Sequence, residues 1–294
     1  MSTLKKAFFQ LHVAVFLAGF TAILGRLMEL NEGMIVWYRL LLSSLFLAAY
    51  ILWKKQSFRL SNKDLISCIF VGALIAIHWL FFYASIKAGN VSIALVCFAA
   101  TGSFTALLEP LLLKRAFDWR ELLTGLMVIA GIALIFHFDF HFRKAIILGL
   151  TAAFFSAVFP VYNKQLVQRI PVPVLSFYEF TGGWLVLFLF LPFYEKQWSF
   201  ISFPVLQDWV WLLILSLLCT VVAFQLAVNA LKKLSPFTTN LMFNLEPLYG
   251  MFLAFVLFQE HRDWTLSFLS GTALLILSVG IETYRVSSGS KKQL

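Results

Sequence analysis

Long apolar runs alternate with short polar or proline-bearing links along almost the whole chain of 294 residues. Most runs hold about 20 residues, the length that an α-helix needs to cross the hydrocarbon core of a bilayer. The pattern therefore predicts an all-α integral membrane protein with ten transmembrane helices. The predicted segments are 7–27, 34–53, 65–84, 91–113, 121–138, 145–164, 174–193, 209–229, 235–258 and 264–284.

The second half of the chain repeats features of the first half at an offset of 145 residues, since Lys87 and Trp119 match Lys232 and Trp264. The stretch 138–144 divides two blocks of five segments. We expect one five-helix repeat over 7–138 and a second over 145–284, followed by a cytoplasmic basic tail over 285–294. An odd number of spans inverts the second repeat in the bilayer, an arrangement common in secondary transporters.

Composition narrows the class of protein further. The chain is 61% hydrophobic and only 13% charged, whereas soluble domains hold about 25% charged residues. This excludes a water-soluble globule and leaves no room for a soluble catalytic domain. The three cysteines lie in apolar segments and suggest neither a disulfide framework nor a metal site, and nothing in the sequence calls for a cofactor.

The net charge of +9 does not indicate nucleic-acid binding, because the placement of the basic residues along the chain accounts for it. If the N-terminus is inside the cell, most lysines and arginines fall at the cytoplasmic ends of the predicted spans. The positive-inside rule then favours a multi-pass protein of the cytoplasmic (inner) membrane with both termini in the cytoplasm.

Several short motifs, in this order and spacing, resemble a known transporter family. They are Gly19–Arg26 in the first span, Trp37-Tyr38-Arg39-Leu40 opening the second, and Leu245-Glu246-Pro247 with Gln259-Glu260 in the ninth. Together they are similar to EamA-type members of the drug/metabolite transporter superfamily. The resemblance implies a central cavity lined by spans 1, 3, 4, 6, 8 and 9, and transport of amino acids or other small metabolites, often by export.

The family pattern places a proline in the middle, and a glutamate at the end, of the fourth helix of each repeat. The second repeat has Pro247 and Glu260, but the first has Gly102 and Arg115 at the 145-residue offset. We therefore expect an asymmetric site nearer the second repeat.

Glu246 is the strongest candidate for substrate binding or coupling, because a carboxylate inside a bilayer costs at least ~2.5 kcal/mol unless it is paired, solvated or protonated. Pro247 follows it and frees a backbone carbonyl one turn earlier. A buried helix–helix hydrogen bond is the alternative role for Glu246. Glu109 precedes Pro110 in the same way, but pairing with Lys114 or Arg115 near the cytoplasmic end explains it more simply.

Arg39 and Glu179 each follow a tyrosine near the start of the second span of their repeat. A guanidinium can bind a substrate carboxylate through two hydrogen bonds, so Arg39 is a further binding candidate. Snorkelling to the lipid headgroups is its alternative. Glu179 is a substrate-binding or coupling candidate on the same positional argument.

Further candidates are uncharged polar and aromatic groups within spans. His78 could carry a proton, although a neutral histidine that donates to a neighbouring helix is an equally simple role. Asn240 and Asn244 are four residues apart and would share a helix face, where they could join helices or line the cavity, as could Asn163 and Asn229. Trp79 and Tyr83 could give the cavity an aromatic lining or face lipid.

These observations favour a secondary transporter, with export as the expected direction, that moves a small metabolite such as an amino acid by alternating access. The expected partners are a small-molecule solute and the lipid bilayer. The residues leave proton coupling open. An intramembrane lipid-modifying enzyme would need a catalytic cluster, and Asp139 with His137 and His141 is the nearest approach. A non-transporting receptor or scaffold would need no central cavity.

Overall fold

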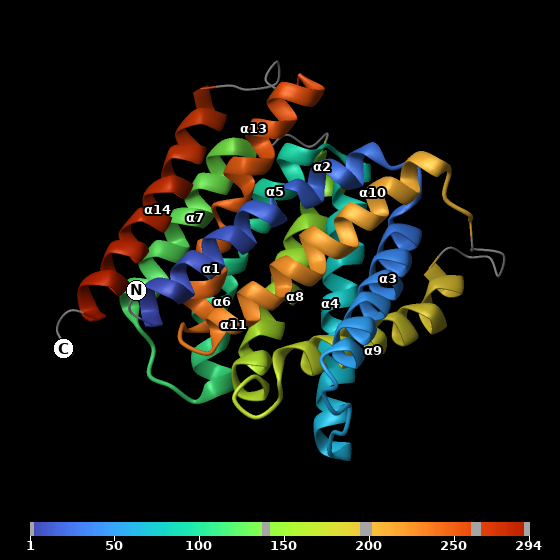
Figure 1. Cartoon of the computed structure of the whole chain (residues 1–294). Coiled ribbons are helices and arrows are strands. Elements are labelled where there is room, and N and C mark those ends of the chain that lie inside the picture. The colour runs from blue at the N-terminus through green and yellow to red at the C-terminus, as the bar shows by residue number, and fades with distance from the viewer. Residues whose placement is uncertain (1–2, 137–141, 195–201, 260–265, 291–294) are drawn as a thin grey trace.

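The computed structural model describes residues 3–136, 142–194, 202–259 and 266–290. All secondary structure in these ranges is helical. Figure 1 shows long, mostly inclined helices, with the start of α1 and the end of α14 on the same side of the molecule. The elements are α1 Thr3–Ala18, α2 Phe20–Leu27, α3 Glu32–Trp53, α4 Asn62–Ala88, α5 Val91–Phe98, α6 Thr101–Leu113, α7 Trp119–Phe136, α8 Arg143–Leu166, α9 Val172–Tyr194, α10 Leu206–Ser216, the π-helix η2 Leu217–Val222, α11 Ala223–Leu231, α12 Pro236–Phe243, α13 Glu246–Phe258 and α14 Leu266–Ser290.

Several helices begin where a short polar side chain caps the first turn. The side chains of Asn31, Ser61, Asn90 and Ser235 each accept a hydrogen bond from the backbone N–H three residues later. Such caps satisfy donors that have no partner within the helix. The polar links of the sequence therefore set the starts of α3, α4, α5 and α12.

Within the described residues, eight helical stretches are long and apolar enough to cross a membrane: Leu4–Leu27, Glu32–Trp53, Asn62–Ala88, Val91–Leu113, Arg143–Leu166, Val172–Phe193, Leu206–Leu231 and Pro236–Phe258. The chain is thus a multi-pass membrane protein. The helices α7 and α14 fall in the remaining two predicted segments and pack against each other. The count of ten spans stays a prediction.

The fourth and ninth predicted spans have the same internal break. In the first half, α5 ends at Phe98 and α6 begins at Thr101; in the second half, α12 ends at Phe243 and α13 begins at Glu246. The helix bounds differ by 145 residues throughout. Lys114 and Gln259, also 145 apart, end α6 and α13 in the left-handed conformation, with φ of 52° and 56°. The duplicated backbone therefore keeps its break although the first copy has Gly102 in place of Pro247.

The helices α4 and α9 cross with their backbones in close contact. A Cβ atom added to Gly72 would lie 2.0 Å from the backbone oxygen of Glu179 and 2.7 Å from the backbone nitrogen of Gly183. Only glycine allows this approach, since a side chain at either position would force the helices apart. The crossing buries the α9 face that carries Glu179.

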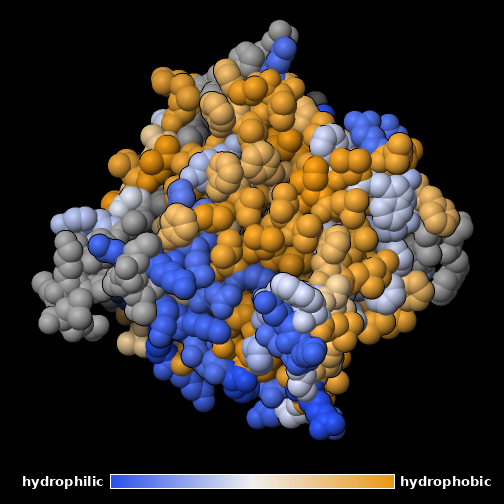
Figure 2. Space-filling model, viewed as in Figure 1, coloured by the Kyte–Doolittle hydropathy of each residue, from blue (hydrophilic) through white to orange (hydrophobic). Residues whose placement is uncertain are grey.

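The loops after α3, α6, α8 and α11 lie on the lower side of the view in Figure 1. Hydrophilic residues gather on that side in Figure 2, below a broad apolar surface. The loops and the helix ends beside them carry exposed basic residues: Lys54, Lys55, Lys63, Lys114, Arg169, Lys232 and Lys233. We name this the basic end of the molecule.

Candidate functional site

A cavity of about 100 Å³ lies among helices from both halves of the chain. Its lining comes from α1, α2, α3, α4, α5, α8, η2, α11, α12 and α13, and most lining residues belong to the second half. The wall is largely apolar, with five phenylalanines among its residues. Five of the sequence candidates line it: Arg39, His78, Trp79, Asn240 and Glu246.

Arg39 is held in one orientation by three other side chains. Its Nε donates to Thr220 Oγ1 at 2.7 Å, and its Nη1 donates to the Tyr83 hydroxyl at 3.1 Å. The guanidinium carbon lies 3.6 Å from the centroid of the Trp79 ring, as a cation–π pair requires. With only 3% of its surface exposed, Arg39 does not snorkel to the lipid headgroups. Tyr83 lies behind it and does not line the cavity.

Thr220 reaches Arg39 because the eighth predicted span contains a π-helical turn. The turn covers Leu217–Val222, and the Thr220 hydroxyl also donates to the Leu215 carbonyl, five residues earlier, at 2.7 Å. Such turns are rare and are frequent at functional sites. Thr220 was not a sequence candidate, because nothing in an apolar run indicates a π-turn.

Glu246 begins α13 and lines the same cavity with 5% of its surface exposed. Among the described residues, its carboxylate has no hydrogen-bond or ion-pair partner. Arg39 interacts with it electrostatically across the cavity, but the two groups form no ion pair within 4.0 Å in the described chain. A guanidinium and a carboxyl group thus face one cavity without direct contact.

Pro247 allows α13 to begin at Glu246. It occupies the first turn of α13, where its missing N–H is not needed by the helix. It is buried beside the cavity and does not line it. The break also corrects one prediction: α12 ends at Phe243, so Asn244 caps it and does not continue the helical face of Asn240.

Asn240 and His78 line the cavity and also bind neighbouring helices. Asn240 Nδ2 donates to Thr105 Oγ1 at 2.8 Å, which joins α12 to α6. His78 Nδ1 lies 3.0 Å from the Ala152 carbonyl; because a carbonyl can only accept, this nitrogen carries the proton. The ring stacks on Phe98 with centroids 5.2 Å apart. Asn244, in contrast, is buried against Gly102 outside the cavity wall.

One face of α8 contributes polar lining, of which the sequence analysis had considered only Asn163. Pro160 lies inside α8, so it leaves the carbonyl of Ser156 without its usual intrahelical partner. Ser156, Pro160 and Asn163 all line the cavity. A proline four residues after a serine in an apolar span is the signal that could have pointed to this face.

Glu179 lies outside the cavity wall, on α9. It is fully buried, and neither carboxylate oxygen has a hydrogen-bond partner in the described chain. The positional match with Arg39 therefore does not place both residues in one site.

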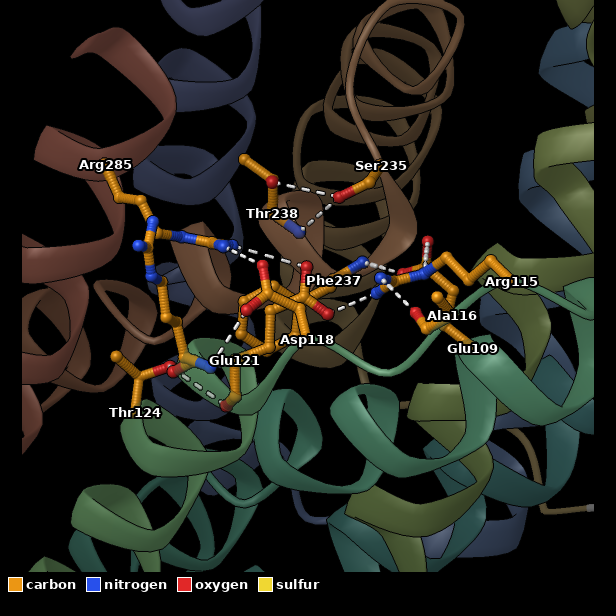
Figure 3. Close-up of polar contacts among 11 residues, drawn as sticks. Glu109, Arg115, Ala116, Asp118, Glu121, Thr124, Ser235, Phe237, Thr238 and Arg285 are labelled. Atoms are coloured by element: carbon orange, nitrogen blue, oxygen red, sulfur yellow. Dashed lines mark hydrogen bonds and ion pairs between the residues drawn. The ribbon is translucent and has the colours of Figure 1, made fainter. Parts of the chain in front are cut away.

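Glu109 belongs to a separate group of charged residues at the basic end, which we name the ionic cluster: Glu109, Arg115, Asp118, Glu121 and Arg285 (Figure 3). Arg115 pairs with Glu109 at 3.2 Å and also with Glu121. Arg285, on α14, pairs with Asp118 and, at 3.3 Å, with Glu121. The cluster joins the α6–α7 connection to α14.

The ionic cluster also reaches α12. Glu109 Oε2 accepts a hydrogen bond of 2.6 Å from the backbone N–H of Phe237, in the first turn of that helix (Figure 3). A carboxylate is favourable at a helix N-terminus. Because Asn240 lies three residues further along α12 and faces the cavity, about one helical turn separates the cavity from the cluster.

Asp118 precedes α7 and keeps its charge at neutral pH. Partial burial acts to raise its pKa, but the backbone N–H of Arg120 and the Arg285 guanidinium outweigh burial and hold the pKa below its usual value. The ion pair with Arg285 is therefore present above the ordinary pKa of an aspartate and is lost only as the pH falls through the lowered value.

Some sequence predictions fall outside the described residues. They concern His137, Asp139 and His141 in the central link and Glu260 after α13. Within the described residues, no group of three or more histidine, cysteine, aspartate or glutamate side chains could hold a metal ion.

Comparison with known proteins shows relatives along the whole chain. Residues 5–137 and 143–282 each match the EamA-like transporter family. An uncharacterized transporter of Synechocystis sp. is 27% identical over 187 residues, which are 59% of this chain and 52% of that protein. An uncharacterized transporter of Archaeoglobus fulgidus is 25% identical over 248 residues, 81% of this chain and 83% of that protein.

The fold itself also has a known counterpart. A crystal structure of a protein with 15% sequence identity superposes with a TM-score of 0.73 and covers 96% of this chain and 98% of that one. The family match spans nearly the whole chain, in agreement with the motifs Gly19–Arg26 and Leu245-Glu246-Pro247. The chain therefore belongs to the EamA-like transporter family.

Proposed function

We propose that the protein is a secondary transporter that exports a small zwitterionic metabolite, such as an amino acid, across the cytoplasmic membrane by alternating access. Arg39 binds the carboxylate of the solute, and Glu246 binds its ammonium group. The observation that carries this proposal is the presence of both buried groups on one cavity without direct pairing.

The energetics of the bilayer support this assignment. An unpaired charge in the membrane interior is costly, so a cavity that keeps two opposite charges apart is complementary to a ligand with both. A guanidinium held flat by Trp79 and fixed by Thr220 presents its remaining donors in a defined plane. Such a plane suits two parallel hydrogen bonds to a carboxylate.

The remainder of the cavity restricts the size and polarity of the solute. Its volume of about 100 Å³ accepts only a small molecule in this conformation. The aromatic wall, formed by Trp79, Phe82, Phe98, Phe159, Phe224 and Phe243, suits an apolar side chain. A small hydrophobic amino acid meets both conditions.

The ionic cluster supports alternating access, because it joins α6, α12 and α14 at one end of the cavity. Glu109 bonds the start of α12, while Asn240 of the same helix bonds Thr105 of α6. Both contacts would have to break for α6 and α12 to separate. We assign this closed contact to the cytoplasmic side, because the group of exposed basic residues that defines the basic end lies there.

The two alternative functions are less well supported. Membership in a transporter family favours transport over lipid modification. A receptor or scaffold gives no reason to keep Arg39 and Glu246 unpaired in a buried cavity.

Flux through proteoliposomes tests the proposal. Vesicles that contain the full chain are loaded with a mixture of labelled amino acids, and efflux is compared among wild type, Glu246→Gln and Arg39→Lys. Glu29→Gln, on an exposed residue, is the matched control. We expect efflux of at least one small apolar amino acid, reduced by both cavity variants and unchanged by the control. Wild-type efflux equal to that of empty vesicles, or undiminished efflux in both cavity variants, would contradict the proposal.

A further inference from the structure

A second polar site lies behind the cavity wall, between α8 and α9. Glu179 on α9 and Asn163 on α8 are both fully buried, with 0% of their surfaces exposed. The Asn163 side chain interacts with the Glu179 carboxyl group. Yet none of their four polar atoms, Glu179 Oε1 and Oε2 and Asn163 Oδ1 and Nδ2, forms a hydrogen bond of ordinary geometry in the described chain.

Full burial of this pair favours the protonated form of Glu179, because a buried carboxylate without a paired cation is costly. An ionised carboxylate offers only acceptors, whereas a primary amide offers donors on one atom and an acceptor on the other. An ionised Glu179 could pair with Asn163 through Nδ2 alone. A protonated Glu179 donates its O–H to Oδ1 and accepts from Nδ2, so a small rotation of either side chain satisfies both groups.

The described helices around Glu179 supply no cation that could take the place of the proton. The titratable group that faces Glu179 from α4 is the Cys68 thiol, which is buried and uncharged. On α11, Gln225 donates to Ser176 of α9. Lys164, next to Asn163 on α8, donates instead to the carbonyls of Leu231 and Leu234 at 2.7 and 2.6 Å. On α3, Arg39 is turned to Thr220 and Tyr83.

We propose that Glu179 and Asn163 form a proton-binding site that is connected to the cavity through Asn163. Asn163 lines the cavity, while Glu179 does not. When Asn163 turns its amide N–H groups toward Glu179, the amide stabilises the carboxylate. The O–H bond then breaks, the electron pair stays on the carboxylate, and water in the cavity accepts the proton. Turning of Asn163 toward a bound solute removes this stabilisation, and Glu179 takes up a proton again.

The close crossing of α4 and α9 confines this exchange to the cavity side. Gly72 and Gly183 bring the two backbones together directly beside Glu179, which leaves no space for lipid or water from that side. The proton is therefore taken up and released on the side of the membrane to which the cavity is open, as the solute is. The site would couple proton movement to transport, and this role rests on the proposed function. The existence of the proton site does not depend on the proposed function.

Infrared spectroscopy of the purified full chain in detergent micelles tests the proton site without any solute. At neutral pH we expect the carbonyl stretch of a protonated carboxylic acid in wild type. Glu179→Gln should remove this band, and Asn163→Leu should shift it because the carbonyl loses its amide partner. Glu246→Gln is the matched control, since Glu246 is, within the described chain, the other buried carboxyl group without a hydrogen-bond or ion-pair partner; the Glu179 contribution should remain in this variant. A band that is absent in wild type, or that is as strong in Glu179→Gln as in wild type, would overturn the proposal.

A second measurement tests the connection to the cavity. Cys219 lines the cavity, so its reaction with a small methanethiosulfonate reagent reports access once Cys68 and Cys97 are replaced by serine. The labelling rate is followed across pH and divided by that of free cysteine. We expect this ratio to change with pH in the protein that keeps Glu179 and to be independent of pH in the same background with Glu179→Gln. A ratio with the same pH dependence in both proteins would overturn the connection.

The two measurements separate this proposal from the transport proposal. Loss of the infrared band in Glu179→Gln supports the proton site even where no amino acid is transported. Amino-acid efflux that continues unchanged in Glu179→Gln would reject coupling through Glu179 and would leave the transport function standing.

Discussion

The Arg39 guanidinium lies flat against the Trp79 indole, with 3.6 Å between the guanidinium carbon and the ring centroid. Both residues line the cavity. Arg39 comes from α3 and Trp79 from α4. The indole therefore gives the charge a defined plane in a region where it has no carboxylate partner in the described chain.

Replacing Trp79 with leucine should weaken binding of the amino acid that we propose as the solute. A desolvated cation–π contact contributes about 2 kcal/mol, so the Kd should rise about thirty-fold. Trp79→Phe keeps an aromatic face and should lose much less. Equilibrium binding to protein in micelles measures the difference; equal Kd values for the leucine and phenylalanine variants would show that the ring face has no role.

Thr220→Val should release the Arg39 side chain while it keeps the shape of residue 220. The change removes a hydrogen bond to a charged group, worth about 1.5–3 kcal/mol, which corresponds to a loss of about tenfold or more in affinity. Thr220→Ser keeps the hydroxyl and serves as the control. Wild-type affinity in the valine variant would mean that Tyr83 and Trp79 alone orient the guanidinium.

Charge exchange between Asp118 and Arg285 tests the role of the ionic cluster. Asp118→Arg or Arg285→Glu alone places like charges together, so the basic end should open and Cys219 should react faster with a membrane-impermeant thiol reagent. The double variant restores opposite charges between the two positions and leaves like charges only between residues 285 and 121, so the rate should return part of the way toward wild type. The assay uses the Cys68→Ser, Cys97→Ser background. Rates that rise further in the double variant would argue against a closing role.

Gly25→Ala should disturb the cavity through Tyr83. A Cβ atom at residue 25 would lie 2.3 Å from Tyr83 Cε1, so the fully buried tyrosine must move away from Arg39. Overpacking of this kind costs about 1–3 kcal/mol, and the melting temperature and solute affinity should both fall. Gly280→Ala is the control, because nothing lies within 4 Å of its added Cβ. An unchanged melting temperature for Gly25→Ala would show that the ring adapts without cost.

The sequence alone indicated the membrane class and the approximate helical segments. Apolar runs of sufficient length predict spans because the transfer of a helix into lipid depends mainly on its own composition. Pro247 marked the break in the second half directly. The matching break after Phe98 has no proline, and the sequence did not predict it.

The candidate site was predictable only in part. Charge or hydrogen-bonding groups in apolar runs marked Arg39, His78, Asn240 and Glu246, and all four line the cavity. The same rule also selected Glu109 and Glu179, which lie elsewhere, because it detects the cost of burying a polar group and not the direction in which it points.

Only the tertiary structure decided which of these groups meet. The π-turn at Thr220, the stacking of Trp79 on Arg39 and the seclusion of Glu179 behind Asn163 all depend on how helices from different parts of the chain cross. Hydropathy is a local property of a segment, whereas a binding site is a set of side chains whose relative positions are fixed by packing between segments. The sequence thus determined that this protein crosses a membrane with polar groups inside it, and packing decided which of them share a cavity.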